Sequence, residues 1–337
     1  MTFWRSATFA ATVVVALGAA AQPRGVPFPP PPVEPRDVPY PGVIALDVDA
    51  SDVQRGIFRV RERVPVAQAG AMTLFYPEWL PGKHAPRGAI NLLSGIEISA
   101  GGKPLEWRRD PVNVYAFHVD VPAGVRALDL TFQFVSPTQT NQGRIVATRE
   151  MLNLQWEAVL LYPAGYYASR IRVAPSVKLP EGWRFAAALD GAVANRDTTR
   201  FAETDLETLV DSPLFAGKYY RLVDLDRGAA RPVRLNMFAD RPDQLAASTE
   251  QLEPHRNLVQ QAYRLFGSQH FDHYDFLFAL TDRMGGIGLE HHRSSENGLD
   301  GSYFTDWSSA ASERDTLAHE FVHSWNGKYR RPADLWA

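Results

Sequence analysis

The sequence contains no cysteine among its 337 residues. This absence excludes disulfide bonds, thiolate metal ligands and cysteine nucleophiles. A metal site in this chain must therefore be built from histidine nitrogens and carboxylate oxygens.

An excess of positive charge is also missing. The 35 Lys and Arg residues are balanced by 38 Asp and Glu residues, which leaves a net charge of -3. We therefore expect no nucleic-acid partner. The hydrophobic content of 45% and the charged content of 22% are typical of a globular chain long enough for two domains.

Long apolar runs are absent beyond the first residues. One positive charge, Arg5, precedes the uncharged apolar segment 7–20, and three alanines stand before Gln22. This pattern predicts a cleavable signal peptide over residues 1–21 and export to the periplasm or the extracellular space. The run is short for a membrane span, so an uncleaved anchor is the alternative and no stable span is expected after cleavage.

Two kinds of segment follow the expected signal peptide. Residues 22–42 are rich in proline and predict an extended linker. Residues 43–230 contain short period-two segments separated by turn residues; in segment 56–64, for example, Phe58, Val60 and Val64 share one face. We expect an N-terminal β-domain that resembles an antiparallel β-sandwich.

From residue 231 to residue 337 the pattern mixes strands and helices, which predicts a second, α+β domain. The expected elements are a strand over 233–238, a helix over 242–266 ended by Gly267, a strand over 276–281, a glycine-rich loop over 285–288 and a last helix over about 312–326.

The last helix carries the sequence His319-Glu320-Phe321-Val322-His323. The two histidines are four residues apart, so their side chains project from one helix face and can bind one Zn²⁺ ion. Glu320 is placed to accept a proton from a water molecule at that ion. A serine at 312 and Asp315 indicate a capping box at the start of the helix, and Gly327 indicates its end. Two solvated histidines on an exposed helix are the alternative interpretation.

The third zinc ligand distinguishes the classes of enzyme with this motif. Tyr329 and Asn326 occupy the positions where one class has histidine and glycine. The other solution is a glutamate about twenty residues after His323, and this chain ends before that position. We therefore expect the zinc site, and with it the catalytic domain, to be incomplete in this chain.

Several segments resemble the M61 glycyl aminopeptidases, a family of zinc metallopeptidases. The segment HEFVHSWNGKYRRP is similar to the zinc helix of that family, and Gly288-Leu289-Glu290-His291 is similar to its glycine-Leu-Glu-His element. Weaker similarities are Trp79-Leu80-Pro81-Gly82 in the β-domain and Asp211-Ser212-Pro213 at the junction of the domains. The loop differs from the family pattern in having two apparent extra residues before Gly288 and an additional histidine, His292.

The resemblance implies a β-rich N-terminal domain followed by a thermolysin-like (gluzincin) catalytic domain, often with a PDZ domain after it. It also implies removal of N-terminal Gly or Ala from peptides with a free N-terminus, with His319 and His323 as zinc ligands and Glu320 as the catalytic base. By the same analogy Glu290 binds the α-amine of the substrate, which agrees with the chemistry of a carboxylate opposite an ammonium. An ion pair between Glu290 and Arg293 is the alternative for this residue.

Two other functions are weighed against this one. The missing third ligand favours a catalytically inactive remnant that binds through its β-domain. An endopeptidase of the same zinc class is a further possibility, but an amine-binding Glu290 argues against it. We do not assign His291 or His292 to the metal, because neighbouring residues of a strand point in opposite directions. The isolated histidines are also not expected to bind metal: His84, His118, His255, His270 and His273.

Overall fold

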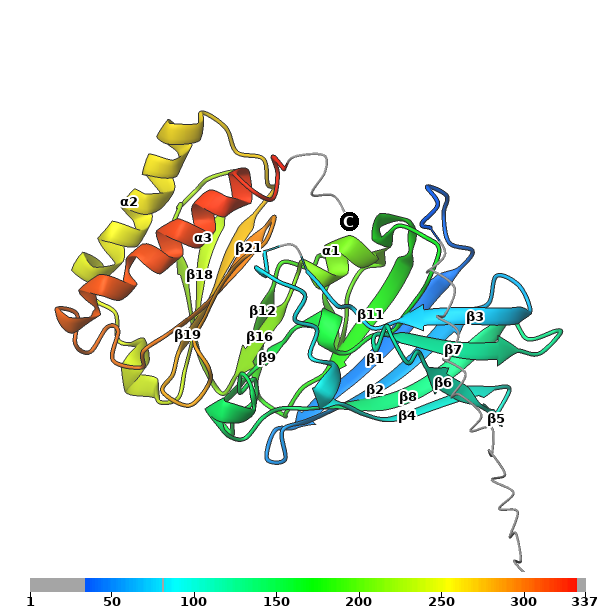
Figure 1. Ribbon diagram of the computed structural model, residues 1–337. Helices are drawn as coiled ribbons and strands as arrows, with labels where there is room; N and C mark the ends of the chain where they lie inside the picture. The colour runs from blue at the N-terminus through cyan, green and yellow to red at the C-terminus, as the bar shows by residue number, and fades with distance from the viewer. Residues whose placement is uncertain (1–33, 81, 332–337) are drawn as a thin grey trace, which may run out of the picture.

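The structure is a computed structural model that describes residues 34–80 and 82–331. The expected signal peptide (1–21) lies outside the described residues. The described chain forms two lobes, a larger one made mainly of strands and a smaller one in which two long helices cover a sheet (Figure 1). This arrangement confirms the predicted fold class, a β-rich N-terminal part followed by an α+β part.

The larger lobe contains three sheets and the short helix α1 (Leu206–Val210). The nine-stranded sheet consists of β1 (Val43–Asp52), β2 (Ile57–Pro65), β4 (Leu93–Ala100), β5 (Lys103–Leu105), β8 (Ala127–Val135), β11 (Arg172–Lys178), β13 (Val193–Asn195), β14 (Thr198–Arg200) and β15 (Thr204–Asp205). The four-stranded sheet consists of β3 (Gly70–Phe75), β6 (Trp107–Arg109), β7 (Ala116–Val121) and β10 (Tyr162–Pro163). The three-stranded sheet consists of β9 (Met151–Leu154), β12 (Arg184–Ala187) and β16 (Leu214–Gly217).

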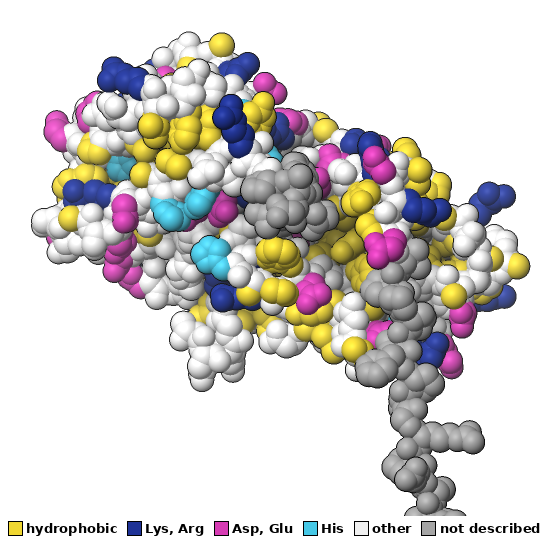
Figure 2. Space-filling model, turned by 45° about the horizontal axis from the view of Figure 1, so that its top comes forward, with side chains coloured by type: hydrophobic (Ala, Val, Ile, Leu, Met, Phe, Trp, Pro, Cys, Tyr) yellow, Lys and Arg dark blue, Asp and Glu magenta, His cyan; other side chains and the backbone are white. Residues whose placement is uncertain are grey.

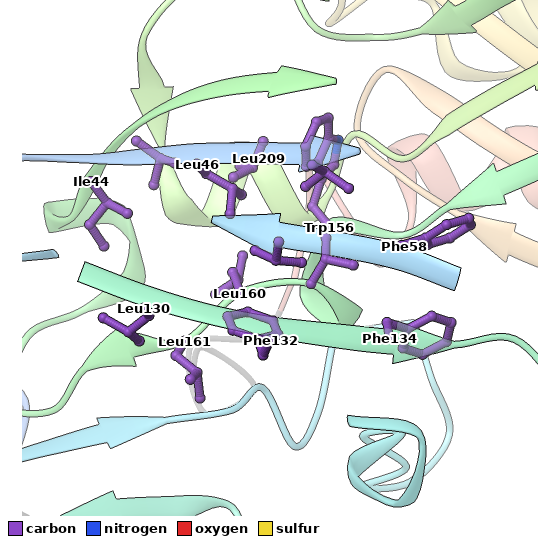
Figure 3. Packing of buried hydrophobic residues seen from close by; sticks show 14 of the residues in the cluster. Ile44, Leu46, Phe58, Leu130, Phe132, Phe134, Trp156, Leu160, Leu161 and Leu209 are labelled. Carbon is purple, nitrogen blue, oxygen red and sulfur yellow. The ribbon is translucent and has the colours of Figure 1, made fainter. Parts of the chain in front are cut away.

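The strand pairs of this lobe are antiparallel as expected, with one exception, because β1 pairs with β11 in parallel. The period-two pattern of β2 places Phe58, Val60 and Val64 in the core, as predicted. Large side chains from several sheets and from the segments between them meet there, including the fully buried Trp156 (Figure 3).

Glu62 lies on the same buried face of β2 and is 3% exposed. One of its carboxylate oxygens accepts a hydrogen bond from the backbone N–H of Leu161 at 3.0 Å. Burial raises the pKa of the Glu62 carboxyl well above its usual range. The core of the β lobe therefore holds a carboxyl group that favours its neutral form.

The smaller lobe is built on a five-stranded sheet in the order β17 (Tyr219–Asp224), β18 (Val233–Ala239), β19 (Tyr274–Leu280), β21 (Ser294–Leu299) and β20 (Ile287–Glu290). The three central strands are parallel, and the two edge strands are antiparallel to their neighbours. Every residue of β19 is buried, as its continuous apolar sequence predicts. The predicted division of the chain at residue 230 stays a prediction.

The helices α2 (Thr249–Phe266) and α3 (Asp315–Trp325) lie over one face of this sheet (Figure 1). Gly267 ends α2 in the left-handed conformation, as predicted. The predicted helix over 242–266 was wrong at its start, because residues Pro242–Leu245 form a separate 3-10 turn and Ser248 caps α2.

The capping box predicted for the last helix was also wrong. A 3-10 turn over Ser309–Glu313 ends one residue before α3. The residue between them, Arg314, has helical dihedral angles and its side chain makes no capping hydrogen bond. Its guanidinium instead stacks 3.5 Å from the ring centre of Trp307. None of the helices within the described residues is both long and apolar enough to span a bilayer.

Candidate active site

The helix α3 brings His319 and His323 together at the surface of the smaller lobe. Their Nε2 atoms are 3.1 Å apart. Two nitrogens that each lie ~2.0–2.1 Å from one tetrahedral zinc ion would be separated by a similar distance. The Nδ1 atom of His323 lies 3.1 Å from the carbonyl oxygen of Asn326, to which it can donate, so that Nε2 keeps a free lone pair. The pair therefore fits a zinc ion.

A third protein ligand is not found in the described part of the chain, where no three His, Cys, Asp or Glu side chains come together as a metal-binding group. His291 and His292 make other contacts, described below. The identity of the third ligand as a downstream glutamate stays a prediction.

Glu320 lies between the histidine pair and the edge strand β20. Glu320 is buried, with 6% of its surface exposed. A Cβ atom placed on Gly288 would lie only 2.3 Å from its Oε1 atom, so the carboxylate packs directly on the glycine backbone. Burial and the nearby negative charge of Glu290 raise the pKa of Glu320 to about 7. Glu320 is thus a proton acceptor matched to neutral pH.

A cleft of about 700 Å³ opens beside these residues, and both lobes line it. The smaller lobe contributes β20 together with His319, Glu320 and His323; the β lobe contributes the segment around Gly82. Histidine side chains gather near acidic ones where the two lobes meet (Figure 2). This volume is in the range of sites for small ligands.

Glu290, at the end of β20, lines the same cleft. Its carboxylate makes no hydrogen bond or ion pair with any residue in the described ranges. The alternative partner, Arg293, instead donates to Asp190 at 2.8 Å and to the carbonyl oxygen of Ala188 at 3.0 Å. Gly82 packs against Glu290, since a Cβ on this glycine would lie 3.1 Å from the carboxyl carbon. Glu290 is therefore available to a ligand.

Behind β20 lies a buried polar network centred on Asp211, which is 6% exposed. Its Oδ1 atom accepts from Lys328 at 2.8 Å and from His291 at 3.1 Å. Its Oδ2 atom accepts from the backbone N–H and the ring of His292. On its other side, His291 donates to Glu296 at 3.2 Å. The network joins the β lobe to the strand that carries Glu290 and to the segment after the zinc helix.

The charges of this network support one another. Burial acts to raise the pKa of the Asp211 carboxyl, but the Lys328 ammonium and the two histidines hold it well below its usual range. Burial likewise acts against a charged His291, but hydrogen bonds to Asp211 and Glu296 raise its pKa to about 9. His291 is thus an imidazolium between two carboxylates, which does not suit a metal ligand.

No local sequence pattern indicates this network, because Asp211 lies 80 positions before His291 and 117 before Lys328. The only available signal was that Asp211 and His291 both belong to segments resembling the M61 family. Of the isolated histidines, His84 lines the cleft, whereas the others contact neighbouring polar atoms: His118, His255, His270 and His273.

Comparison with known proteins agrees with the geometry. Residues 45–218, more than half of the chain, match the Peptidase M61 N-terminal domain. The chain belongs to the M61 peptidase family. Residues 312–337 match the M61 glycyl aminopeptidase family, and this match contains helix α3 with His319, Glu320 and His323. No curated protein matches this M61 chain.

Two solved structures show the same fold. An aminopeptidase N family protein from Idiomarina loihiensis is similar over 86% of this chain and 49% of its own, with a TM-score of 0.68 and 16% identity. The second is an M1 zinc metallopeptidase from Deinococcus radiodurans, a Glu-to-Ala mutant bound to a Tyr-Ser-Ala substrate. It is similar over 86% of this chain and 64% of its own, with a TM-score of 0.50 and 14% identity. The chain thus spans about half to two thirds of the length of these structures.

Proposed function

We propose that this M61 protein is a zinc metallo-aminopeptidase that removes N-terminal Gly or Ala from peptides. One observation carries the proposal: His319, His323, Glu320 and the unpaired Glu290 line a single cleft. A metal-binding pair, a proton acceptor and an anionic group for a free N-terminus are the parts that an aminopeptidase needs.

Each residue has a separate role in the reaction. His319 and His323 would hold Zn²⁺, which supplies a Lewis acid that polarises the scissile carbonyl and makes water more acidic. Glu320 accepts the proton of the attacking water and returns it to the departing amine. Glu290 binds the α-ammonium of the substrate, so that only the first residue lies between this charge and the peptide bond to be cleaved.

The specificity for Gly is supported by the match to a glycyl aminopeptidase family over residues 312–337, and Ala is added from the family resemblance alone. Export to the periplasm or extracellular space is proposed from the sequence of residues 1–21 alone. N-terminal sequencing of the protein recovered from fractionated cells tests this: a mature chain that starts at Gln22 outside the cytoplasm is expected, and an intact Met1 inside it contradicts export.

A catalytically inactive binding protein is the second candidate. It is favoured by the two-ligand zinc site within the described residues. Zinc measured after purification separates the two functions, because tightly held stoichiometric zinc is expected of the enzyme and weak or no zinc of the remnant.

The proposal is tested by assaying the protein expressed from its open reading frame on glycine and alanine arylamides, with and without a chelator. N-acetylated versions of the same arylamides are the matched controls. We expect cleavage of the free amines only, and loss of cleavage with the chelator. Equal cleavage of the acetylated compounds would indicate an endopeptidase-like activity and would exclude the proposed role of Glu290.

A further inference from the structure

The cleft contains a second unpaired charge, opposite in sign to Glu290. Arg87 of the β lobe lines the cleft, and its exposed guanidinium makes no ion pair or side-chain hydrogen bond with the residues the structure describes. Although both residues line the cleft, Arg87 and Glu290 form no ion pair with each other. The cleft therefore presents a free cation and a free anion at separate places.

The other basic side chains of the cleft are already engaged. Lys83 forms an ion pair with the buried carboxylate of Glu157 at 2.8 Å. Arg144 donates to the carbonyl oxygen of Gly285 at 3.1 Å and to the side chain of Asn153. Among the lysine and arginine side chains of the cleft within the described ranges, Arg87 is thus the one left for a ligand.

The loop that carries Arg87 also contacts Glu290. Its base is closed because the carbonyl oxygen of Glu78 accepts from the backbone N–H of Arg87 at 2.9 Å and of Gly88 at 2.8 Å. The two ends of the loop lie close together at Gly88, where a Cβ would lie 2.3 Å from the carbonyl oxygen of Pro77. Gly82 of the same loop packs on Glu290. The same loop therefore carries Arg87 and contacts Glu290 through Gly82.

We propose that Arg87 binds the C-terminal carboxylate of the substrate and that the cleft selects short peptides with both ends free. The carboxylate end of the peptide binds Arg87 by charge-assisted hydrogen bonds. The ammonium end binds Glu290, and this part of the proposal rests on the function proposed above. A cleft of about 700 Å³ is in the size range of sites that enclose small ligands, which includes a short peptide. Arg87 is a specificity-determining residue in this account.

The test measures binding rather than catalysis, on the metal-free protein. Calorimetric titrations with glycylglycine and with glycylglycinamide compare a free and a blocked carboxylate on the same peptide. The variant is Arg87→Met, which keeps the length of the side chain and removes the charge. Arg108→Met is the matched control, because Arg108 is an exposed arginine of β6 outside the cleft.

We expect the unmodified protein and the Arg108→Met control to bind glycylglycine about tenfold more tightly than the amide, as a charge-assisted hydrogen bond allows. Arg87→Met should bind both peptides with the same affinity. Glu290→Gln should weaken both and keep the preference for the free carboxylate. Equal binding of the two peptides by the unmodified protein, a preference that survives in Arg87→Met, or no measurable glycylglycine binding in the millimolar range would each overturn the proposal. Because no metal is present, a failure of the hydrolytic function leaves this result unaffected.

Discussion

Gly288 of strand β20 lies directly against the carboxylate of Glu320 on helix α3. A Cβ on this glycine would come within 2.3 Å of Oε1, a distance that real Cβ contacts do not reach. The edge strand and the zinc helix are therefore in contact through a glycine backbone, and this contact fixes where the proposed catalytic base lies.

The first prediction concerns this contact. Gly288→Ala should displace the Glu320 carboxylate. The backbone of strand β20 is held in the sheet, so the flexible Glu320 side chain is the part that must move. A displacement of the base by about 1 Å can cost ~10²-fold in rate, so we expect a decrease of that order in kcat/KM on glycine arylamides.

Gly286→Ala is the control for this prediction, because the nearest atom to a Cβ there is 3.5 Å away and the contact is ordinary. It should retain most of the activity. Thermal unfolding should show that both variants fold. A fully active Gly288→Ala protein would mean that Glu320 does not occupy this position during catalysis.

The second prediction concerns the ion pair between Asp211 and Lys328, which links the β lobe to the segment after the zinc helix. The two side chains are 2.8 Å apart, and both residues are buried. Removing one member takes an opposite charge away from the other within the buried network, which costs about 3 kcal/mol in the free energy of unfolding. We expect Asp211→Asn and Lys328→Met each to reduce stability by this order, and the double variant by clearly less than the sum.

The measurement is a double-mutant cycle from denaturant unfolding of the four proteins. Arg63→Met with Asp129→Asn provides a comparison cycle, because that pair is exposed in the β lobe and should show a coupling below about 1 kcal/mol. Additive effects at Asp211 and Lys328 would show that the buried pair does not connect the lobes energetically.

The third prediction is a pH dependence of stability that comes from His291. Its pKa is about 9 in the folded protein and about 6.5 in an unfolded chain, so the folded state holds the proton more tightly. The stabilisation is fully present below pH ~6.5 and is lost as the pH rises through about 9. The melting temperature should fall over this interval, and His291→Gln should reduce that fall.

Melting curves of the two proteins from pH 6 to pH 9.5 in the presence of a chelator provide the measurement. His84→Gln is the control histidine, because it is exposed and should leave the pH dependence unchanged. A fall of the same size in His291→Gln would assign the effect to other groups.

The helix α3 and the close approach of its two histidines could be predicted from the sequence, because the i, i+4 spacing is a local property of a helix. The buried strand β19 and the glycine end of α2 were predictable for the same reason. The start of α3 was not, since the 3-10 turn and the stacking of Arg314 on Trp307 replaced the expected cap.

The supporting part of the site depends on tertiary contacts that no local pattern encodes. Strand β20 precedes β21 in the chain but lies outside it at the sheet edge, and only this order brings Gly288 to Glu320. Asp211 meets His291 and Lys328 across the two lobes, and Arg87 reaches the cleft from the β lobe. Sequence reasoning therefore proposed the chemical groups of the candidate site but not the residues that position them.

The central claim is that His319, His323 and Glu320 form a zinc-dependent hydrolytic centre. The most direct test measures zinc content and glycine arylamide hydrolysis in the same preparations of the unmodified protein and of Glu320→Gln, each expressed from the complete open reading frame. The account predicts equal zinc in both proteins and a decrease in hydrolysis of ~10²-fold or more in the variant, because Glu320 moves a proton but does not hold the metal. Hydrolysis that persists unchanged in Glu320→Gln, with zinc still bound, would contradict it.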